Sequence, residues 1–83
     1  MSSLASEKAV IAVAAHCTED ELVVVLADGR TISTPLSWFP RLREADPESR
    51  GNCQLMAGGR GIHWPDLDED IAVLGLLEGI KAH

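Results

Sequence analysis

The stretch ELVVVLADGRTIST, residues 21–34, decides the fold of this 83-residue chain. After Glu21, its first six residues are a continuous aliphatic run rich in β-branched side chains, which favour an extended strand. Asp28 and Gly29 follow, and this pair is typical of a two-residue hairpin loop because both of its positions need a positive φ. We therefore predict an antiparallel hairpin with one apolar face, formed by Val23, Val25 and Ile32. The cross-strand pairs expected in this register are Leu26 with Thr31, Val25 with Ile32, Val24 with Ser33, and Val23 with Thr34.

The segments on either side extend this hairpin. Residues 8–16 (KAVIAVAAH) are short-sided or β-branched, so we expect them to complete a three-stranded antiparallel meander over residues 9–34. Pro35 ends the third strand because it has no N–H to donate to a ladder. Ser37 is then the expected N-cap of a short helix over residues 38–45. The side chains that this helix would bury are Phe39 and Leu42.

The second half of the chain predicts a weaker hairpin and a terminal helix. Residues 53–56 and 62–64 flank the glycine-rich loop AGGRG, which favours a tight turn between two short strands. Residues 69–78 predict a helix, because Asp68 suits an N-cap and further acidic residues suit the first turn. The apolar stripe of this helix would consist of Ile71, Leu74 and Leu77, and Val73, Leu76 and Ile80 would widen it.

Together these elements indicate an α+β fold. We expect a small antiparallel sheet, made of the three-stranded meander and the short hairpin, with two helices on one face. A chain of 83 residues has room for one domain. We expect residues 9–83 to form that domain and residues 1–8, which are mostly small and polar, to be a flexible N-terminus.

Charge and composition disfavour several classes of function. Seven Lys and Arg residues against 13 Asp and Glu residues give a net charge of −6, which would repel phosphate backbones, so we expect no direct contact with nucleic acid. No apolar run approaches the length of a bilayer span and no leader is apparent, so we expect no membrane contact and a cytoplasmic protein. Cys17 and Cys53 lack CxxC spacing, and we expect two reduced thiols, although the sequence leaves a disulfide between them open.

The side chains with chemistry to offer form no recognisable catalytic or metal-binding set. Cys53 and His63 could be diagonal neighbours across the weaker hairpin, too far apart for a direct hydrogen bond without a bend. The acidic run Asp66–Asp70 lacks a calcium-loop pattern, since Ile71 and Leu77 occupy the positions of its glycine and glutamate. We therefore expect no enzyme activity and no cofactor. The alternative is a small enzyme or metal-binding domain that uses Cys53 and His63 or the acidic run.

The terminal segment also predicts self-association. A helix over residues 69–78 is apolar almost all round and needs more cover than so small a domain provides. Packing against a second copy, most simply in a two-fold dimer, would supply that cover. The alternative is a monomer with this helix at its centre.

Four strings give the chain a resemblance to a known family. They are PLSWFPRL at 35–42, DPESRGN at 46–52, GRGIHWPDLDEDI at 59–71 and LLEG at 76–79. In these strings the chain resembles the bacterial domain-of-unknown-function family 2442, from about Ala9 onward. The resemblance implies a small α+β domain without an established activity, and it supplies no catalytic residues. Some family members are encoded beside a second small protein in arrangements that look like toxin–antitoxin pairs, which implies a small co-encoded protein as a partner.

These observations favour a non-catalytic protein-interaction or regulatory module, antitoxin-like in its relation to its partner. An acidic domain would meet a basic partner faster, because complementary charge raises the encounter rate. An exposed tryptophan beside carboxylates would supply an aromatic anchor, although the same residues could simply cap a helix and pack in the core. The residues that we expect at the interaction site are Trp64, Asp66, Asp68, Glu69 and Asp70.

Overall fold

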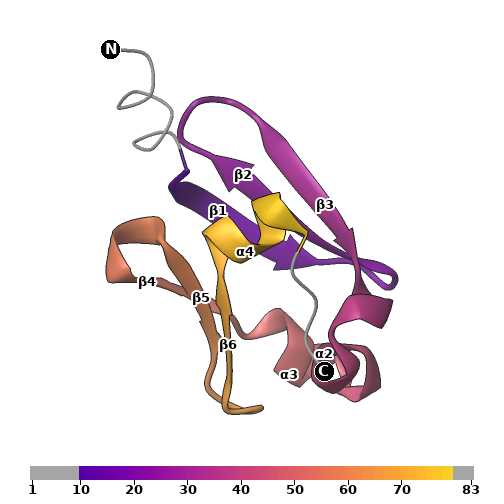
Figure 1. Ribbon diagram of the computed structural model, residues 1–83. Helices are drawn as coiled ribbons and strands as arrows, with labels where there is room; N and C mark the ends of the chain where they lie inside the picture. The colour runs from indigo at the N-terminus through magenta and orange to yellow at the C-terminus, as the bar shows by residue number, and fades with distance from the viewer. Residues whose placement is uncertain (1–9, 80–83) are drawn as a thin grey trace.

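Two three-stranded antiparallel sheets and three short α-helices make up residues 10–79, the part of the chain described by the computed structural model (Figure 1). The α+β class expected from the sequence is therefore confirmed. The segment predicted to be a flexible N-terminus, residues 1–8, lies outside the described residues.

The first sheet is the meander. Its strands are β1 (Ala12–Cys17), β2 (Glu21–Leu26) and β3 (Thr31–Pro35), in the order β1-β2-β3. The predicted three strands are confirmed, but the predicted register between β2 and β3 is wrong by one residue. The observed partners are Leu22 with Thr34, Val23 with Ser33, Val24 with Ile32, and Val25 with Thr31.

The loop between β2 and β3 explains the shift in register. The loop has three residues, closed by hydrogen bonds from Leu26 N to Arg30 O (2.8 Å) and from Gly29 N to Leu26 O (3.0 Å). Gly29 has a φ of 93°, so it supplies the left-handed position that such a loop needs. A one-residue shift moves every side chain to the other face of a strand. The buried side chains of β2 are accordingly Leu22, Val24 and Leu26, in place of the expected Val23 and Val25.

The second sheet contains the predicted hairpin and one further strand. Its strands are β4 (Gln54–Met56), β5 (Gly61–Trp64) and β6 (Glu69–Ala72), in the order β4-β5-β6. The glycine-rich loop between β4 and β5 contains a 3₁₀ turn, η2 (Ala57–Gly59). Gly59 lies against β1 with a φ of 92°, and a Cβ at this position would lie 2.5 Å from the Ala12 carbonyl oxygen. Only glycine fits there, and this close approach brings the second sheet against the first.

Strand β6 consists of residues that the sequence had predicted as the start of the terminal helix. The helix itself, α4 (Val73–Glu78), begins four residues later than expected. Ile71 pairs with Ile62 and is buried, so these residues gain both a hydrogen-bonded ladder and core packing as a strand. A first helical turn would offer less, because helix nucleation is unfavourable without tertiary support. Helix α4 buries Val73 and Leu76, which the prediction had placed beside the main stripe, whereas Leu74 and Leu77 of that stripe are exposed.

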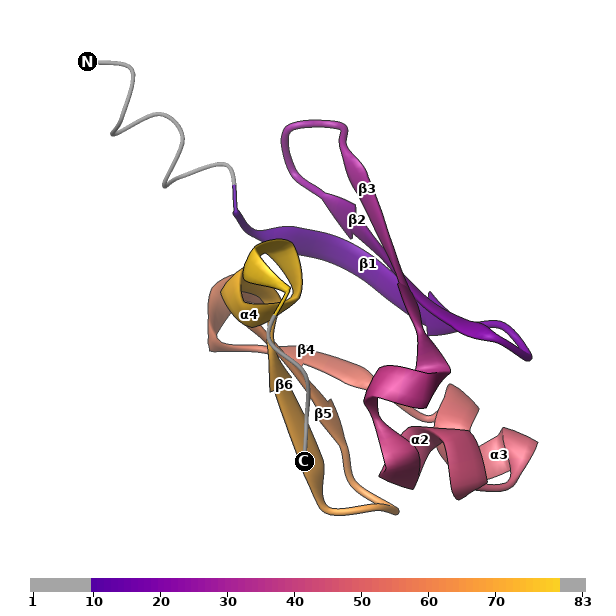
Figure 2. The same ribbon diagram turned by 45° about the vertical axis from the view of Figure 1, so that its right-hand side comes forward.

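Three short helical segments connect the two sheets. They are η1 (Leu36–Trp38), α2 (Pro40–Glu44) and α3 (Pro47–Gly51), and α2 and α3 lie beyond the end of β3 in both views (Figures 1 and 2). The predicted N-cap at Ser37 is wrong, since Ser37 lies inside η1 and α2 begins at Pro40 without a side-chain cap. Phe39 and Leu42 are buried as predicted.

The Arg50 side chain stabilises the C-terminal end of α2 through hydrogen bonds. Its Nε donates to the Leu42 carbonyl oxygen at 2.8 Å, and its Nη2 donates to those of Arg43 and Ala45 at 2.9 Å each. Carbonyls at a helix C-terminus lack intrahelical partners, and a guanidinium satisfies several of them at once. Arg50 thereby ties α3 to α2.

One core joins the two sheets. Helix α4 lies at their junction, where it contacts both β3 and β6 (Figure 2). The buried apolar side chains come from both sheets, from α4 and from the segment around α2. They are Ala12, Leu22, Val24, Leu26, Leu36, Phe39, Leu42, Ile62, Trp64, Ile71, Val73 and Leu76.

Candidate functional site

The acidic run spans the hairpin loop between β5 and β6 and the first two residues of β6, Glu69 and Asp70. Trp64 and Glu69 form the last pair of the ladder, and Leu67 N donates to Trp64 O at 3.2 Å across the turn. Pro65 at the second position of this turn fits its fixed φ. Asp68 adopts a φ of 52°, a left-handed conformation that aspartate tolerates better than most residues. Asp68 is therefore a loop residue, and its predicted role as helix N-cap is wrong.

Three of the carboxylates in this run have partners elsewhere in the domain. Asn52 Nδ2 donates to Asp66 Oδ2 at 3.0 Å. Glu69 Oε1 lies 3.8 Å from Arg41 Nε. Asp70 Oδ1 lies 2.5 Å from His63 Nδ1. The partners lie on three different elements, so the carboxylates diverge. Among residues 10–79 no group of three or more His, Cys, Asp and Glu side chains is placed to hold a metal ion.

Trp64, the expected aromatic anchor, is a core residue. Its side chain is fully buried, and its indole Nε1 donates to the Arg50 carbonyl oxygen at 2.9 Å. A tryptophan with its apolar body packed and its N–H satisfied has nothing left to offer a partner. The expectation that Trp64 anchors an interface is therefore wrong. Of the other residues expected at the site, Asp66, Asp68 and Asp70 are exposed and Glu69 is half-buried.

The structure assigns Cys53 and His63 to different neighbours. Cys53 Sγ donates to the Ala15 carbonyl oxygen at 3.6 Å, whereas His63 pairs with Asp70 across β5 and β6. Burial raises the pKa of the Cys53 thiol, and burial first, then the neighbouring Cys53, raises that of Cys17 to about 11. A thiol with a raised pKa is a poor nucleophile near neutral pH, because the thiolate is the reactive form. Both thiols are therefore mainly protonated near neutral pH.

The clearest surface feature is a set of exposed large apolar side chains. On α4, Leu74 is 50% exposed and Leu77 is 40% exposed, and their spacing of three places them on one side of the helix. We name this pair the α4 stripe. The remaining members lie on β1 and β4, which contact each other. They are Val13, Leu55 and Met56.

Sequence periodicity had placed the α4 stripe in the core. The apolar residues around it are nearly continuous, so the pattern alone could not fix which side of the helix faces inward. The residue at which β6 ends and α4 begins decides which side of the helix faces the core. The sequence signal that could have revealed β6 is the alternation in EDIAV, which places Ile71 and Val73 on one face of a strand.

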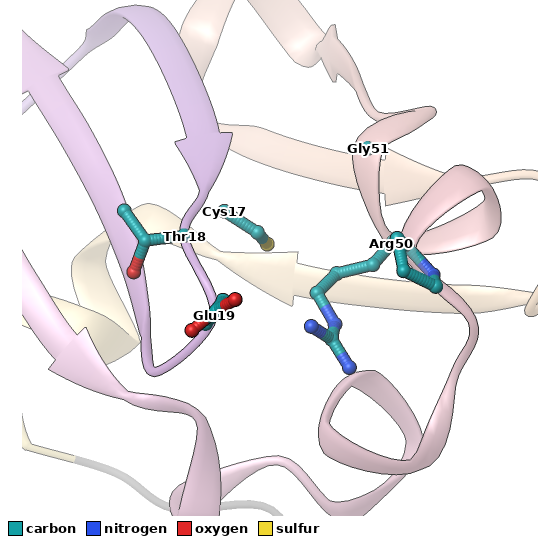
Figure 3. A pocket seen from close by; sticks show the side chains of 6 residues that line it. Cys17, Thr18, Glu19, Arg50 and Gly51 are labelled. Atoms are coloured by element: carbon teal, nitrogen blue, oxygen red, sulfur yellow. The ribbon is translucent and has the colours of Figure 1, made fainter.

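A shallow pocket lies between the β1–β2 turn and α3 (Figure 3). Its volume is about 360 Å³, and it is lined by Cys17, Thr18, Glu19, Pro47, Arg50 and Gly51. The Arg50 guanidinium on its wall is already engaged with the end of α2. Besides this guanidinium, the lining supplies the Cys17 thiol, the Thr18 hydroxyl and the exposed Glu19 carboxylate. Within residues 10–79 no helix is long and apolar enough to cross a membrane.

Comparison with known proteins identifies the family of this chain. A family model described as a protein of unknown function, DUF2442, matches residues 12–82, and the chain belongs to this family. The resemblance found in the sequence is thereby confirmed. No curated protein matches the chain.

Two solved structures are similar to this one. The crystal structure of a protein of unknown function from Rhodospirillum rubrum has a TM-score of 0.79 and 27% identity, over 88% of this chain and 90% of that one. The solution structure of an uncharacterised protein from Chromobacterium violaceum has a TM-score of 0.77 and 24% identity, over 99% of this chain and 76% of that one. The second likeness concerns the fold alone. These neighbours add no activity to the family assignment.

Proposed function

We propose that this domain is a non-catalytic protein-interaction module whose contact surface is the α4 stripe. The observation that carries the proposal is the exposure of two leucines, Leu74 and Leu77, on a six-residue helix at the junction of the sheets. Such a helix has little stability of its own and is held by its buried side. Keeping two leucines on its outer side favours a surface used for contact.

We further propose that the occupant of this surface is a small basic protein encoded beside the domain. The net charge of −6 supports a basic partner, because opposite charge steers encounter and like charge opposes a second copy of this chain. The exposed Glu78, next to Leu77, places a carboxylate at the edge of the stripe. The exposed carboxylates of the β5–β6 hairpin, Asp66 and Asp68 in its loop and Asp70 on β6, add to the field that attracts such a partner. An antitoxin-like role remains the specific form of this proposal, by analogy with the arrangement of related genes.

The test is co-expression with the neighbouring gene product, followed by titration of the two purified proteins. We expect a complex at micromolar concentration. The double substitution Leu74→Ser with Leu77→Ser should weaken it by about tenfold or more, since each leucine loses apolar contact area on binding. Val13→Ser is the matched control, because Val13 is 57% exposed and lies on β1, outside the stripe. Circular dichroism checks that both variants fold.

Three outcomes would count against the proposal. The first is an absence of association at micromolar concentration. The second is a complex whose affinity is the same with the double substitution as without it. The third is a dimer of the chain alone, seen by sedimentation, that the double substitution dissociates. That result would make the stripe a self-association surface, the two-fold contact expected from the apolar terminal segment.

A further inference from the structure

The two cysteines, far apart in sequence, lie at the same point of the fold. Cys17 ends β1, and Cys53 immediately precedes β4. Cys53 Sγ reaches the Ala15 carbonyl oxygen at 3.6 Å. Ala15 is two residues before Cys17, so their side chains are on the same face of β1, and both are half-buried. The Cys53 side chain therefore contacts β1 at a point two residues from Cys17.

The pocket beside α3 gives a second, independent measure of this proximity. Cys17 and Gly51 both line it, and the Cys53 backbone N–H donates to the Gly51 carbonyl oxygen at 3.1 Å. The segment from Gly51 to Cys53 thus passes beside the end of β1. Figure 3 shows the Cys17 sulfur directed into the space between the β1–β2 turn and Arg50. A small reagent in the pocket can therefore reach this thiol.

We propose that Cys17 and Cys53 are a modification site that forms an intramolecular disulfide with a low-molecular-weight disulfide, such as oxidised glutathione, as oxidant. The bond would tie β1 of the first sheet to the segment that leads into β4 of the second. Disulfide geometry needs two Cα atoms within about 7 Å and side chains directed toward each other, which adjacent chain segments such as these can provide.

The reaction balances as two thiol–disulfide exchanges. The Cys17 thiol loses its proton, and its thiolate attacks one sulfur of the oxidant, releasing one small thiolate and leaving a mixed disulfide. The Cys53 thiolate then attacks the Cys17 sulfur and releases the second small thiolate. The two protein thiols are oxidised by two electrons, the oxidant is reduced to two thiols, and the protons pass to the released thiolates. Burial raises the pKa of the Cys17 thiol, so its thiolate is a minor species near neutral pH and the first step is slow. The Arg50 guanidinium on the pocket wall acts in the opposite direction and favours the thiolate.

The test is equilibration of the purified full-length chain with mixtures of reduced and oxidised glutathione. Acid quenching, alkylation and mass spectrometry then measure the fraction that has lost two hydrogens, and peptide mapping assigns the link to Cys17 and Cys53. The same measurement in concentrated urea gives the equilibrium constant for the unfolded chain. We expect the folded chain to favour the disulfide by at least about tenfold over the unfolded chain, because the fold holds the two thiols together. The single variants Cys17→Ser and Cys53→Ser should yield glutathione adducts only.

Two results would overturn the proposal. One is a folded wild-type chain that carries only glutathione adducts, as the single variants do. The other is an equilibrium constant that is no larger folded than unfolded, which would mean that the fold holds the thiols apart. Near-ultraviolet circular dichroism, recorded on the same samples, confirms that the compared chain is folded.

Discussion

Trp64 contributes both to the packing of the core and to the polar contacts between elements of this domain. Its ring fills the core between the second sheet and α3, and its indole N–H holds the Arg50 carbonyl oxygen at 2.9 Å. The side chain of the same Arg50 holds the end of α2. The indole therefore helps to position Arg50, which in turn stabilises the end of α2. The role of this tryptophan is structural, and its side chain is not part of a binding surface.

We predict that Trp64→Phe lowers the free energy of unfolding by about 2–4 kcal/mol, because it removes one buried hydrogen bond, leaves a carbonyl without a donor and opens a small cavity. Urea unfolding followed by far-ultraviolet circular dichroism measures the change. Leu74→Ala, at a half-exposed position, is the control and should change the same quantity by about 0.5 kcal/mol or less. A loss for Trp64→Phe no larger than that control would contradict the core assignment.

At the scale of elements, the β5–β6 hairpin decides how the C-terminal third of the domain folds. The sequence HWPDLDEDI has two physical interpretations, an acidic helix start and a hairpin loop with proline at its second position. The hairpin prevails because Ile71 and Val73 then reach the core on alternate positions of an extended chain. This preference depends on contacts with β5, which no local pattern in residues 66–73 contains.

The same contrast explains which parts of the fold could be predicted. The meander over residues 9–34, the burial of Phe39 and Leu42 and the pairing of β4 with β5 follow from local signals, namely β-branched runs, proline and glycine. The wrong predictions concern positions where a shift of one residue decides which side chains of a strand face the core. The loop at Asp28-Gly29 has three residues instead of two, and this changes the buried set of β2.

The candidate site was less accessible to prediction for a related reason. The exposed carboxylates were found from sequence, but whether Trp64 accompanies them at the surface depends on tertiary packing. The exposure of the α4 stripe depends on where β6 ends, and the proximity of Cys17 and Cys53 depends on how the second sheet docks on the first. Each is a long-range property that a single chain pattern does not encode.

For the hairpin loop, we predict opposite effects of glycine at two neighbouring aspartates. Asp68→Gly should raise the free energy of unfolding by about 0.5–1 kcal/mol, because Asp68 has a φ of 52° and glycine adopts that conformation without strain. Asp66→Gly should lower it by about 0.5–2 kcal/mol, because Asp66 has no positive φ, glycine adds freedom to the unfolded chain, and the hydrogen bond from Asn52 Nδ2 is lost. Thermal unfolding of the two variants measures the difference, and equal signs would contradict the loop geometry.

At the scale of the whole molecule, the two sheets share one core but are connected by short helical segments and by few polar contacts. The Cys53–Ala15 contact and the close approach of Gly59 to Ala12 are where the second sheet touches β1. Both contacts lie along the same strand. The docking of the two sheets therefore depends on the face and edge of β1, and a change that charges this junction should weaken the entire domain.

Ionisation of the two thiols would place charge at this junction. The direction in which pH then changes the free energy of unfolding follows from the pKa values of the thiols. Burial raises the pKa of Cys17 from 9.0 to about 11, and burial also raises that of Cys53. Below about pH 9 the thiols are protonated in both the folded and unfolded states, so they add no pH dependence. Between about 9 and about 11 the unfolded chain loses the Cys17 proton while the folded chain keeps it. The unfolded state then binds fewer protons, so the free energy of unfolding falls as the pH rises.

We therefore predict that the wild-type chain, kept reduced with a phosphine, loses stability between about pH 9 and about 11 more steeply than Cys17→Ser. Serine does not ionise in this range, so the difference in slope isolates the thiol, while any constant offset from the substitution cancels. All other ionisable side chains are common to both chains, so the comparison of slopes removes their contribution. Urea unfolding at a series of pH values measures the two slopes. Parallel curves would mean that Cys17 titrates as freely in the folded chain as in the unfolded one, and that the end of β1 is open to solvent instead of covered by the second sheet.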